Sequence, residues 1–312
     1  CGFLFFGIFN SYAVFFFGNF LCATGMTLIS GADRAILFDI LLQYGEGNDA
    51  KHYFSRSDAF GTAGILLSFP IGSLLAGNTV ITYPGGLPLT FILSGISFLL
   101  AGGVVLLVKE PQRHEKISHP LKEGVRGFLF IFRHSDMKLY SFNFALISST
   151  TFYIYWFYQK ITGLAGLRVE LNGFIGAGFN LFGLILLINI PWFDKRLGTK
   201  KLLFISALLP GMLFILLGFT FSPFISLPSI FLITGLKQFR APLLSDLMNH
   251  LIESRNRATV LSGVSMLERI IQFFLYPLIG FIADKSLNSA MFILGGVTLF
   301  FLFISKIPEN TT

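Results

Sequence analysis

Long apolar runs separated by short polar breaks dominate the chain. Apolar runs of about 20 residues are typical of membrane-spanning helices. The breaks carry turn-forming residues, such as Pro84 with Gly85 and Ser222 with Pro223. Because polar residues do not alternate with the apolar ones, we predict helices rather than barrel strands. The predicted segments are 1–9 (an incomplete span), 14–42, 57–77, 87–108, 138–159, 172–193, 200–220, 223–250, 257–282 and 287–306.

Composition and charge agree with a membrane protein. Hydrophobic residues make up 54% of the chain and charged residues only 12%, whereas soluble domains carry about 25% charged residues. Most of the 23 lysines and arginines lie in alternate loops, including 109–137 and 194–201. Such loops face the cytoplasm. We therefore predict a multi-pass protein of the plasma (inner) membrane with a cytoplasmic C-terminus, and the net charge of +7 requires no nucleic-acid partner.

The polar segment 109–137 divides the chain. We predict an N-terminal helix bundle over 1–108, a cytoplasmic linker over 109–137 and a C-terminal six-helix bundle over 138–312. Within the linker, apolar residues recur at helical spacing between Lys122 and Arg133. This pattern favours an amphipathic helix on the membrane surface, and a disordered linker is the alternative.

Several motifs occur in a fixed order along the chain. Asp39 and Pro70 of the first set of helices recur in the second set as Asp246 and Pro277. The other motifs are the stretch Ser30–Asp39, Trp156 with Gln159, the loop Asp194–Lys201 and the helix end Gly280–Lys285. Together they resemble the major facilitator superfamily of transporters, in its prokaryotic type.

The resemblance implies an all-α polytopic fold of two bundles, with about ten of the family's twelve transmembrane helices present. It begins at the third family helix, so we expect the chain to be a fragment without the first two. It also implies a secondary transporter, or permease, that moves a small solute by alternating access, for uptake or efflux, as a monomer. Asn19 replaces the arginine of the family's fourth-helix motif, which argues against proton antiport.

Ionisable residues lie within the predicted spans, where each charge costs roughly 2.5–3.5 kcal/mol near the bilayer centre. We therefore expect them to face the interior of the bundle. The predicted lining of the substrate path is Asn19, Ser30, Asp33, Arg34, Asn143, Tyr155, Gln159, Lys237 and Arg240. The predicted coupling or charge network is Glu268, Arg269 and Gln272. A purely structural ion-pair network that holds the helices together is the alternative.

The loop motifs suggest a cytoplasmic gate. A carboxylate at a helix end can pair with cations or accept backbone hydrogen bonds. The predicted gate comprises Asp39, Asp194, Lys195, Arg196, Gly198, Lys200, Lys201 and Asp246. An ordinary solvated loop is the alternative, particularly for the two lysines at its end.

The function classes that remain are a transporter and, as alternatives, a membrane scaffold or sensor and an integral-membrane enzyme. The sequence has no hydrolase, nucleotide-binding or metalloprotease motif, so we expect neither an enzyme nor a cofactor or metal site. The charges within the spans sum to a small positive value, which hints at an anionic solute. Proton coupling through Asp33 or Glu268 is open, because burial favours the neutral carboxyl group.

Overall fold

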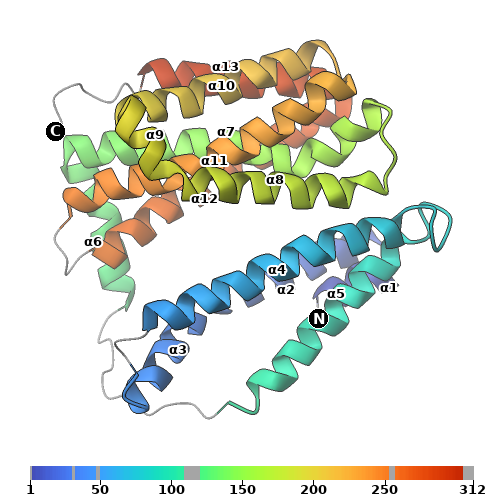
Figure 1. Cartoon of the computed structure of the whole chain (residues 1–312), viewed down its shortest axis with the longest axis horizontal. Coiled ribbons are helices and arrows are strands. Elements are labelled where there is room, and N and C mark those ends of the chain that lie inside the picture. Colours follow the sequence, from blue (N-terminus) through green and yellow to red (C-terminus); the bar gives the residue numbers. More distant parts are fainter. Residues whose placement is uncertain (1, 30–31, 47–49, 109–119, 253–256, 305–312) are drawn as a thin grey trace. The chain divides into compact units, whose positions relative to one another are not determined.

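In a computed structural model, every regular element of the described residues is an α-helix (Figure 1). The described residues are 2–29, 32–46, 50–108, 120–252 and 257–304. The helices of the first part are α1 (Gly2–Ile8), α2 (Tyr12–Ile29), α3 (Ala32–Gln43), α4 (Ala50–Ala76), α5 (Leu87–Val105) and α6 (Pro120–Arg133). Those that follow are α7 (Ser135–Leu164), α8 (Leu171–Ile188), α9 (Ile190–Leu197), α10 (Thr199–Phe219), α11 (Pro223–His250), α12 (Arg257–Lys285) and α13 (Leu287–Ile304).

The helices form where the apolar runs predict them, with two differences in continuity. The segment 14–42 contains two helices, α2 and α3, and residues 30 and 31 between them lie outside the described residues. The segment 172–193 is divided between α8 and α9 at Asn189. Pro191 lies in the first turn of α9, where its missing N–H costs no helical hydrogen bond.

Six helices in the described ranges are long and apolar enough to cross a membrane, namely α2, α4, α5, α8, α10 and α12, and the shorter α13 is also apolar. The two long helices α7 and α11 are absent from this set because they carry many hydroxyl, amide and charged side chains. Half of the 30 residues of α7 are buried, Ser148, Ser149 and Thr150 among them. A polar helix of this length suits the interior of a helical bundle, where other protein groups satisfy its side chains.

The chain forms two compact units. The first comprises Cys1–Lys116 together with Arg168–Ala177, and the second comprises Ile117–Leu167 together with Gly178–Thr312. In the first unit, α1 packs against α2 and α5, and α4 packs against α5. In the second, α7 contacts α11, α12 and α13, while α10 packs between α11 and α13.

The helix expected in the linker is present as α6, which packs against α12. Ile131 of α6 is fully buried in a cluster with Tyr140 and Leu244, whereas Val125 is exposed. The helix itself is confirmed, but its buried face is not the predicted one, because Val125, Leu129 and Phe132 of the predicted apolar face are exposed. The placement of α6 on a membrane surface stays a prediction.

The outer faces of the helices are apolar. Large side chains such as Phe16, Phe273 and Phe274 are more than 70% exposed. Contiguous apolar surface of this kind is unstable in water and is stable against hydrocarbon. Lipid is therefore the medium that covers these faces.

The contact between α10 and α13, which run side by side in Figure 1, depends on two glycines. A Cβ atom at Gly295 of α13 would collide with the carbonyl oxygen of Gly211 and the side chain of Ile215, both on α10. A Cβ atom at the neighbouring Gly296 would meet only open space. Small residues at a helix interface allow this close backbone approach within membranes.

We predict that Gly295→Ala lowers thermal stability, because α10 and α13 must separate to admit the added methyl group. Overpacking of this kind costs about 1–3 kcal/mol. The matched control, Gly296→Ala, should be neutral or slightly stabilising because alanine favours the helix. The measurement is the fraction of detergent-solubilised protein that stays monodisperse after heating. Equal behaviour of the two variants would contradict the packing described.

Candidate functional site

Arg240 of α11 is the most deeply buried charged residue in the described part of the chain. Its side chain is 2% exposed and lies between α7 and α10. One terminal nitrogen donates hydrogen bonds to the Leu203 carbonyl and to the Ser206 hydroxyl (2.8 Å), and the other donates to the Asn143 side-chain oxygen. Neutral acceptors from two neighbouring helices thus solvate the guanidinium.

This environment differs from an ion-pair network. Among the described residues, no carboxylate forms an ion pair with Arg240, and its Nε has no hydrogen-bond partner. Arg240 and Asn143 were both predicted to line the substrate path. The geometry gives Arg240 a role in joining α7, α10 and α11, which is close to the structural alternative but uses neutral partners.

Lys237 lies one turn before Arg240 and has a different environment. Its ammonium nitrogen lies 5.2 Å from the ring centroid of Phe152 and 6.0 Å from that of Tyr155, both on α7. Cations are attracted to the faces of aromatic rings at such distances. Lys237 as a whole residue is half-buried.

Glu268 of α12 is the carboxylate that interacts electrostatically with Lys237. The described atoms of the two groups do not form a direct ion pair. Instead, the side-chain amide of Gln272 donates to the Glu268 carboxylate (3.1 Å). The Ser149 hydroxyl of α7 donates to the Glu268 backbone carbonyl (3.4 Å), which fixes α12 against α7 at this level.

Amide and aromatic groups complete this cluster. The Gln238 amide donates to the Tyr155 hydroxyl (3.1 Å), and the ring of Tyr276 packs near those of Phe152 and Trp156. We call the six residues that combine charge, amide and ring groups the α7–α11–α12 cluster. They are Phe152, Tyr155, Lys237, Gln238, Glu268 and Gln272.

The structure brings together only some of the predicted residues. Tyr155, Lys237, Glu268 and Gln272 share the cluster, and Arg269, which is exposed, interacts electrostatically with Glu268. The Gln159 amide donates to the Tyr158 hydroxyl at 3.2 Å. Sequence analysis did not identify Phe152 and Gln238. Gln238 directly follows Lys237, so the presence of an amide beside an intramembrane charge was the available signal.

The predicted residues of the first unit have no comparable cluster. Asn19 is exposed and donates to the carbonyl of Phe15 on its own helix (3.1 Å). Asp33 at the start of α3 is exposed. Ser30 lies outside the described residues, and so does the side chain of Arg34. Their predicted role in the substrate path stays a prediction.

The gate motif forms a turn between α9 and α10. The Thr199 hydroxyl donates to the Asp194 carboxylate (2.6 Å), and the Gly198 N–H donates to the Asp194 backbone carbonyl (2.8 Å). Gly198 has a φ of 77°, in the region that favours glycine. The Arg196 guanidinium lies 4.3 Å from the centroid of the Trp192 ring.

The other gate residues form none of the contacts of this turn that are described above. Lys195 and Lys201 are exposed, and Lys200 is half-buried. Asp39 is half-buried on α3, and Asp246 on α11 lies 3.8 Å from the imidazole of His250, with both side chains largely exposed. The described residues contain no group of three or more metal-binding side chains. The gating role of these residues stays a prediction.

Comparison with solved structures supports the fold. The chain is similar to the crystal structure of the Escherichia coli fucose:proton symporter FucP, with a TM-score of 0.51 and 15% sequence identity over 98% of this chain and 81% of that chain. No family model matches the sequence, and comparison with curated proteins finds no match. The all-α fold of this chain is thus similar to that of the symporter, which confirms the predicted fold class of an all-α polytopic membrane protein.

We predict that Arg240→Lys lowers thermal stability although it preserves the charge. A single ammonium cannot reproduce the fork that reaches three acceptors on two helices. Each buried acceptor left without a donor costs about 1–3 kcal/mol. Arg269→Lys, on the exposed side of α12, is the matched control and should have little effect. Unchanged stability of Arg240→Lys in the heating assay would contradict the buried environment described here.

Proposed function

We propose that the protein is a secondary transporter that moves a small solute across the membrane by alternating access, with the α7–α11–α12 cluster as part of its solute site. The observation that carries the proposal is the pair Lys237 and Glu268. Both are half-buried within membrane helices and interact without direct contact. Intramembrane charges are costly and mark solute or ion pathways.

The contrast with Arg240 supports this assignment. The Arg240 guanidinium is buried and already donates three hydrogen bonds from its terminal nitrogens to neighbouring helices, so it is poorly accessible to a solute. The Lys237 ammonium faces two ring surfaces, which attract it but accept no conventional hydrogen bond. Its donors therefore remain available for a solute.

The chemistry of the cluster favours a small polar solute with hydroxyl groups. Amides such as Gln238 and Gln272 donate and accept hydrogen bonds, and the rings of Phe152 and Tyr155 offer flat apolar faces. The Lys237 ammonium adds a preference for negative charge on the solute. The similarity in fold to a fucose:proton symporter is consistent with a hydroxylated solute and with proton coupling.

We predict that Lys237→Ala abolishes solute flux without reducing membrane expression. The purified protein is reconstituted in liposomes, and counterflow of radiolabelled sugars, sugar acids and small carboxylates identifies the solute. Lys285→Ala is the matched control, because the Lys285 ammonium lies over the Phe281 ring (4.2 Å) at the end of α12 and outside the cluster. Undiminished flux in Lys237→Ala would remove Lys237 from the site, and a preference for cationic solutes would exclude the proposed charge preference.

We predict that Glu268→Gln uncouples solute movement from protons. The glutamine amide is nearly isosteric with the carboxyl group but does not take up a proton near neutral pH. Counterflow, which needs no gradient, should persist, whereas accumulation driven by an imposed pH gradient should be lost. If wild-type flux ignores the pH gradient, Glu268 has no coupling role and the transporter is a uniporter.

A further inference from the structure

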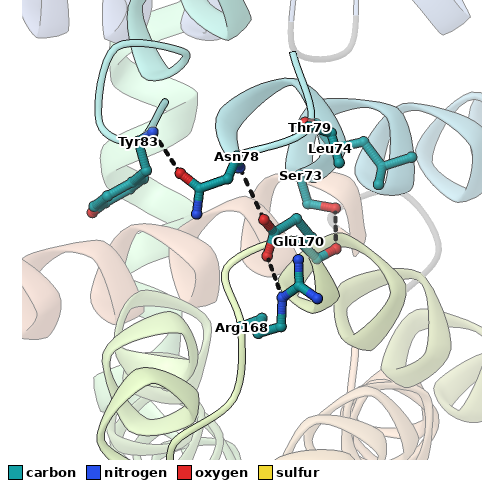
Figure 2. A network of polar contacts seen from close by, with 7 residues as sticks. All are labelled: Ser73, Leu74, Asn78, Thr79, Tyr83, Arg168 and Glu170. Carbon is teal, nitrogen blue, oxygen red and sulfur yellow. Dashed lines mark hydrogen bonds and ion pairs between the residues drawn. The ribbon is translucent and has the colours of Figure 1, made fainter. Parts of the chain in front are cut away.

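Two arginines outside the membrane-spanning helices have opposite environments. Arg168, in the loop between α7 and α8, forms an ion pair with Glu170 (3.4 Å) (Figure 2). The backbone N–H of Asn78 also donates to the Glu170 carboxylate (2.9 Å), and the Ser73 hydroxyl donates to the Glu170 backbone carbonyl (2.8 Å). The charge of Arg168 is thus compensated by a carboxylate that other groups of the chain hold in place.

Arg196 of α9 has no such partner. Among the described residues, no carboxylate forms an ion pair with it, and the nearby Asp194 carboxylate accepts the Thr199 hydroxyl instead (2.6 Å). The Arg196 guanidinium lies 4.3 Å from the centroid of the Trp192 ring. A ring face attracts a guanidinium but accepts no conventional hydrogen bond from it, so the N–H donors of Arg196 remain available for an anion.

The opposite face of α9 fixes this helix to the second unit. Phe193 packs edge-on against Phe239 of α11, with 5.7 Å between the ring centroids, and belongs to the apolar residues around the buried cluster of Leu243. Trp192 directly precedes Phe193 but is 51% exposed. The Trp192 and Arg196 side chains therefore lie on the exposed side of a helix that the core holds in place.

An exposed apolar stripe leads along α8 to this pair. Its members recur at helical spacing, which puts them on one face, and each is between 46% and 69% exposed; they are Leu181, Ile185, Ile188 and Trp192. Helical backbone hydrogen bonds continue across the junction of α8 and α9, because the Asn189 N–H donates to the Ile185 carbonyl (3.3 Å) and the Phe193 N–H donates to the Asn189 carbonyl (3.1 Å). Arg196, four residues after Trp192, completes the stripe at its polar end.

The order of groups along this stripe matches the order of groups in a phospholipid. Both α8 and α10 are long and apolar enough to cross a membrane, and α9 joins their ends, which places it at the level of the lipid headgroups. Tryptophan is enriched at that level. The exposed Lys195 and Lys201 add positive charge, and so does the N-terminal end of α10 through the helix dipole. Apolar, aromatic and cationic groups thus face the acyl chain, the interface and the phosphate in turn.

We propose that Trp192 and Arg196, with the apolar stripe of α8, form a binding site for one anionic phospholipid. The Arg196 guanidinium donates hydrogen bonds to the lipid phosphate, whose oxygens match the guanidinium fork. Basic residues beside a span attract anionic lipids. Phosphatidylglycerol carries a net negative charge, whereas the ammonium of phosphatidylcholine compensates its phosphate, so the site should prefer the former. This site requires a membrane but not transport of a solute.

The chain has two tryptophans, so Trp156→Phe leaves Trp192 as the only indole. This variant is reconstituted in bilayers of phosphatidylglycerol and phosphatidylcholine in which one of the two lipids carries brominated acyl chains, which quench nearby tryptophan fluorescence. We predict that brominated phosphatidylglycerol quenches Trp192 several-fold more effectively than brominated phosphatidylcholine at the same mole fraction. Adding Arg196→Gln should bring the ratio close to one. The matched control Lys285→Gln, which removes a cation from the Phe281 ring (4.2 Å), should leave the preference unchanged.

Three outcomes would overturn this site. Equal quenching by the two brominated lipids indicates ordinary lipid contact without selection. A preference that persists in Arg196→Gln removes the guanidinium from the site. Loss of the preference upon addition of soluble glycerol phosphate indicates a site for free phosphate groups rather than for a lipid.

A second measurement covers the case in which Trp156→Phe does not fold. Native mass spectrometry of the unsubstituted protein counts the phosphatidylglycerol molecules that remain bound during delipidation in detergent. We expect one tightly held molecule, which Arg196→Gln loses and Lys285→Gln retains. Equal retention by all three proteins would overturn the site. Neither measurement depends on solute flux, so each result is independent of the proposed transport function.

Discussion

The cost of placing an ionised side chain among apolar helices is the constraint on which this structure depends. Such a charge requires polar partners from the protein, because lipid supplies none. Arg240 meets the requirement at its terminal nitrogens, which donate to Leu203, Ser206 and Asn143 on two helices. The need for an acceptor accounts for the buried Asn143 among the polar side chains of α7. Solvation of one cation thus determines how three helices pack.

Lys237 meets the same requirement only in part, and this difference is informative. It lies one turn from Arg240 on the same helix, yet its partners are two ring faces and the field of Glu268. Partial solvation of the ammonium group does not favour stability. A hydrogen-bond acceptor in place of one ring would lower the free energy of the folded protein. Retention of a half-buried ammonium is expected when the missing partner is a ligand. The same helix therefore carries one cation enclosed by hydrogen-bond acceptors and another, Lys237, whose role in a solute site we propose.

Much of the fold was predictable from the sequence, because apolar runs and loop charges report directly on the lipid environment. Lys237 and Glu268 were predictable for the same reason, since a charge in an apolar run stands out. The enclosure of Arg240 was not, because its acceptors Ser206 and Asn143 lie on other helices and are ordinary membrane residues. Glu170 lies in a polar loop, where a carboxylate gives no signal, and its role depends on a contact with Asn78 that only tertiary structure reveals.

Polar contacts in a helical bundle differ in the free energy that is needed to break them. A contact that exposes an unpaired charge when it breaks would trap the molecule in one state, because the buried partner would bear the desolvation cost. Glu170 differs from this case, because its ion-pair partner Arg168 lies in the same loop and is largely exposed to water. Arg240 lacks a partner of this kind, because its acceptors are on neighbouring helices and its side chain is buried away from water. The distribution of polar partners, more than their number, therefore distinguishes the environment of Arg240 from that of Glu170.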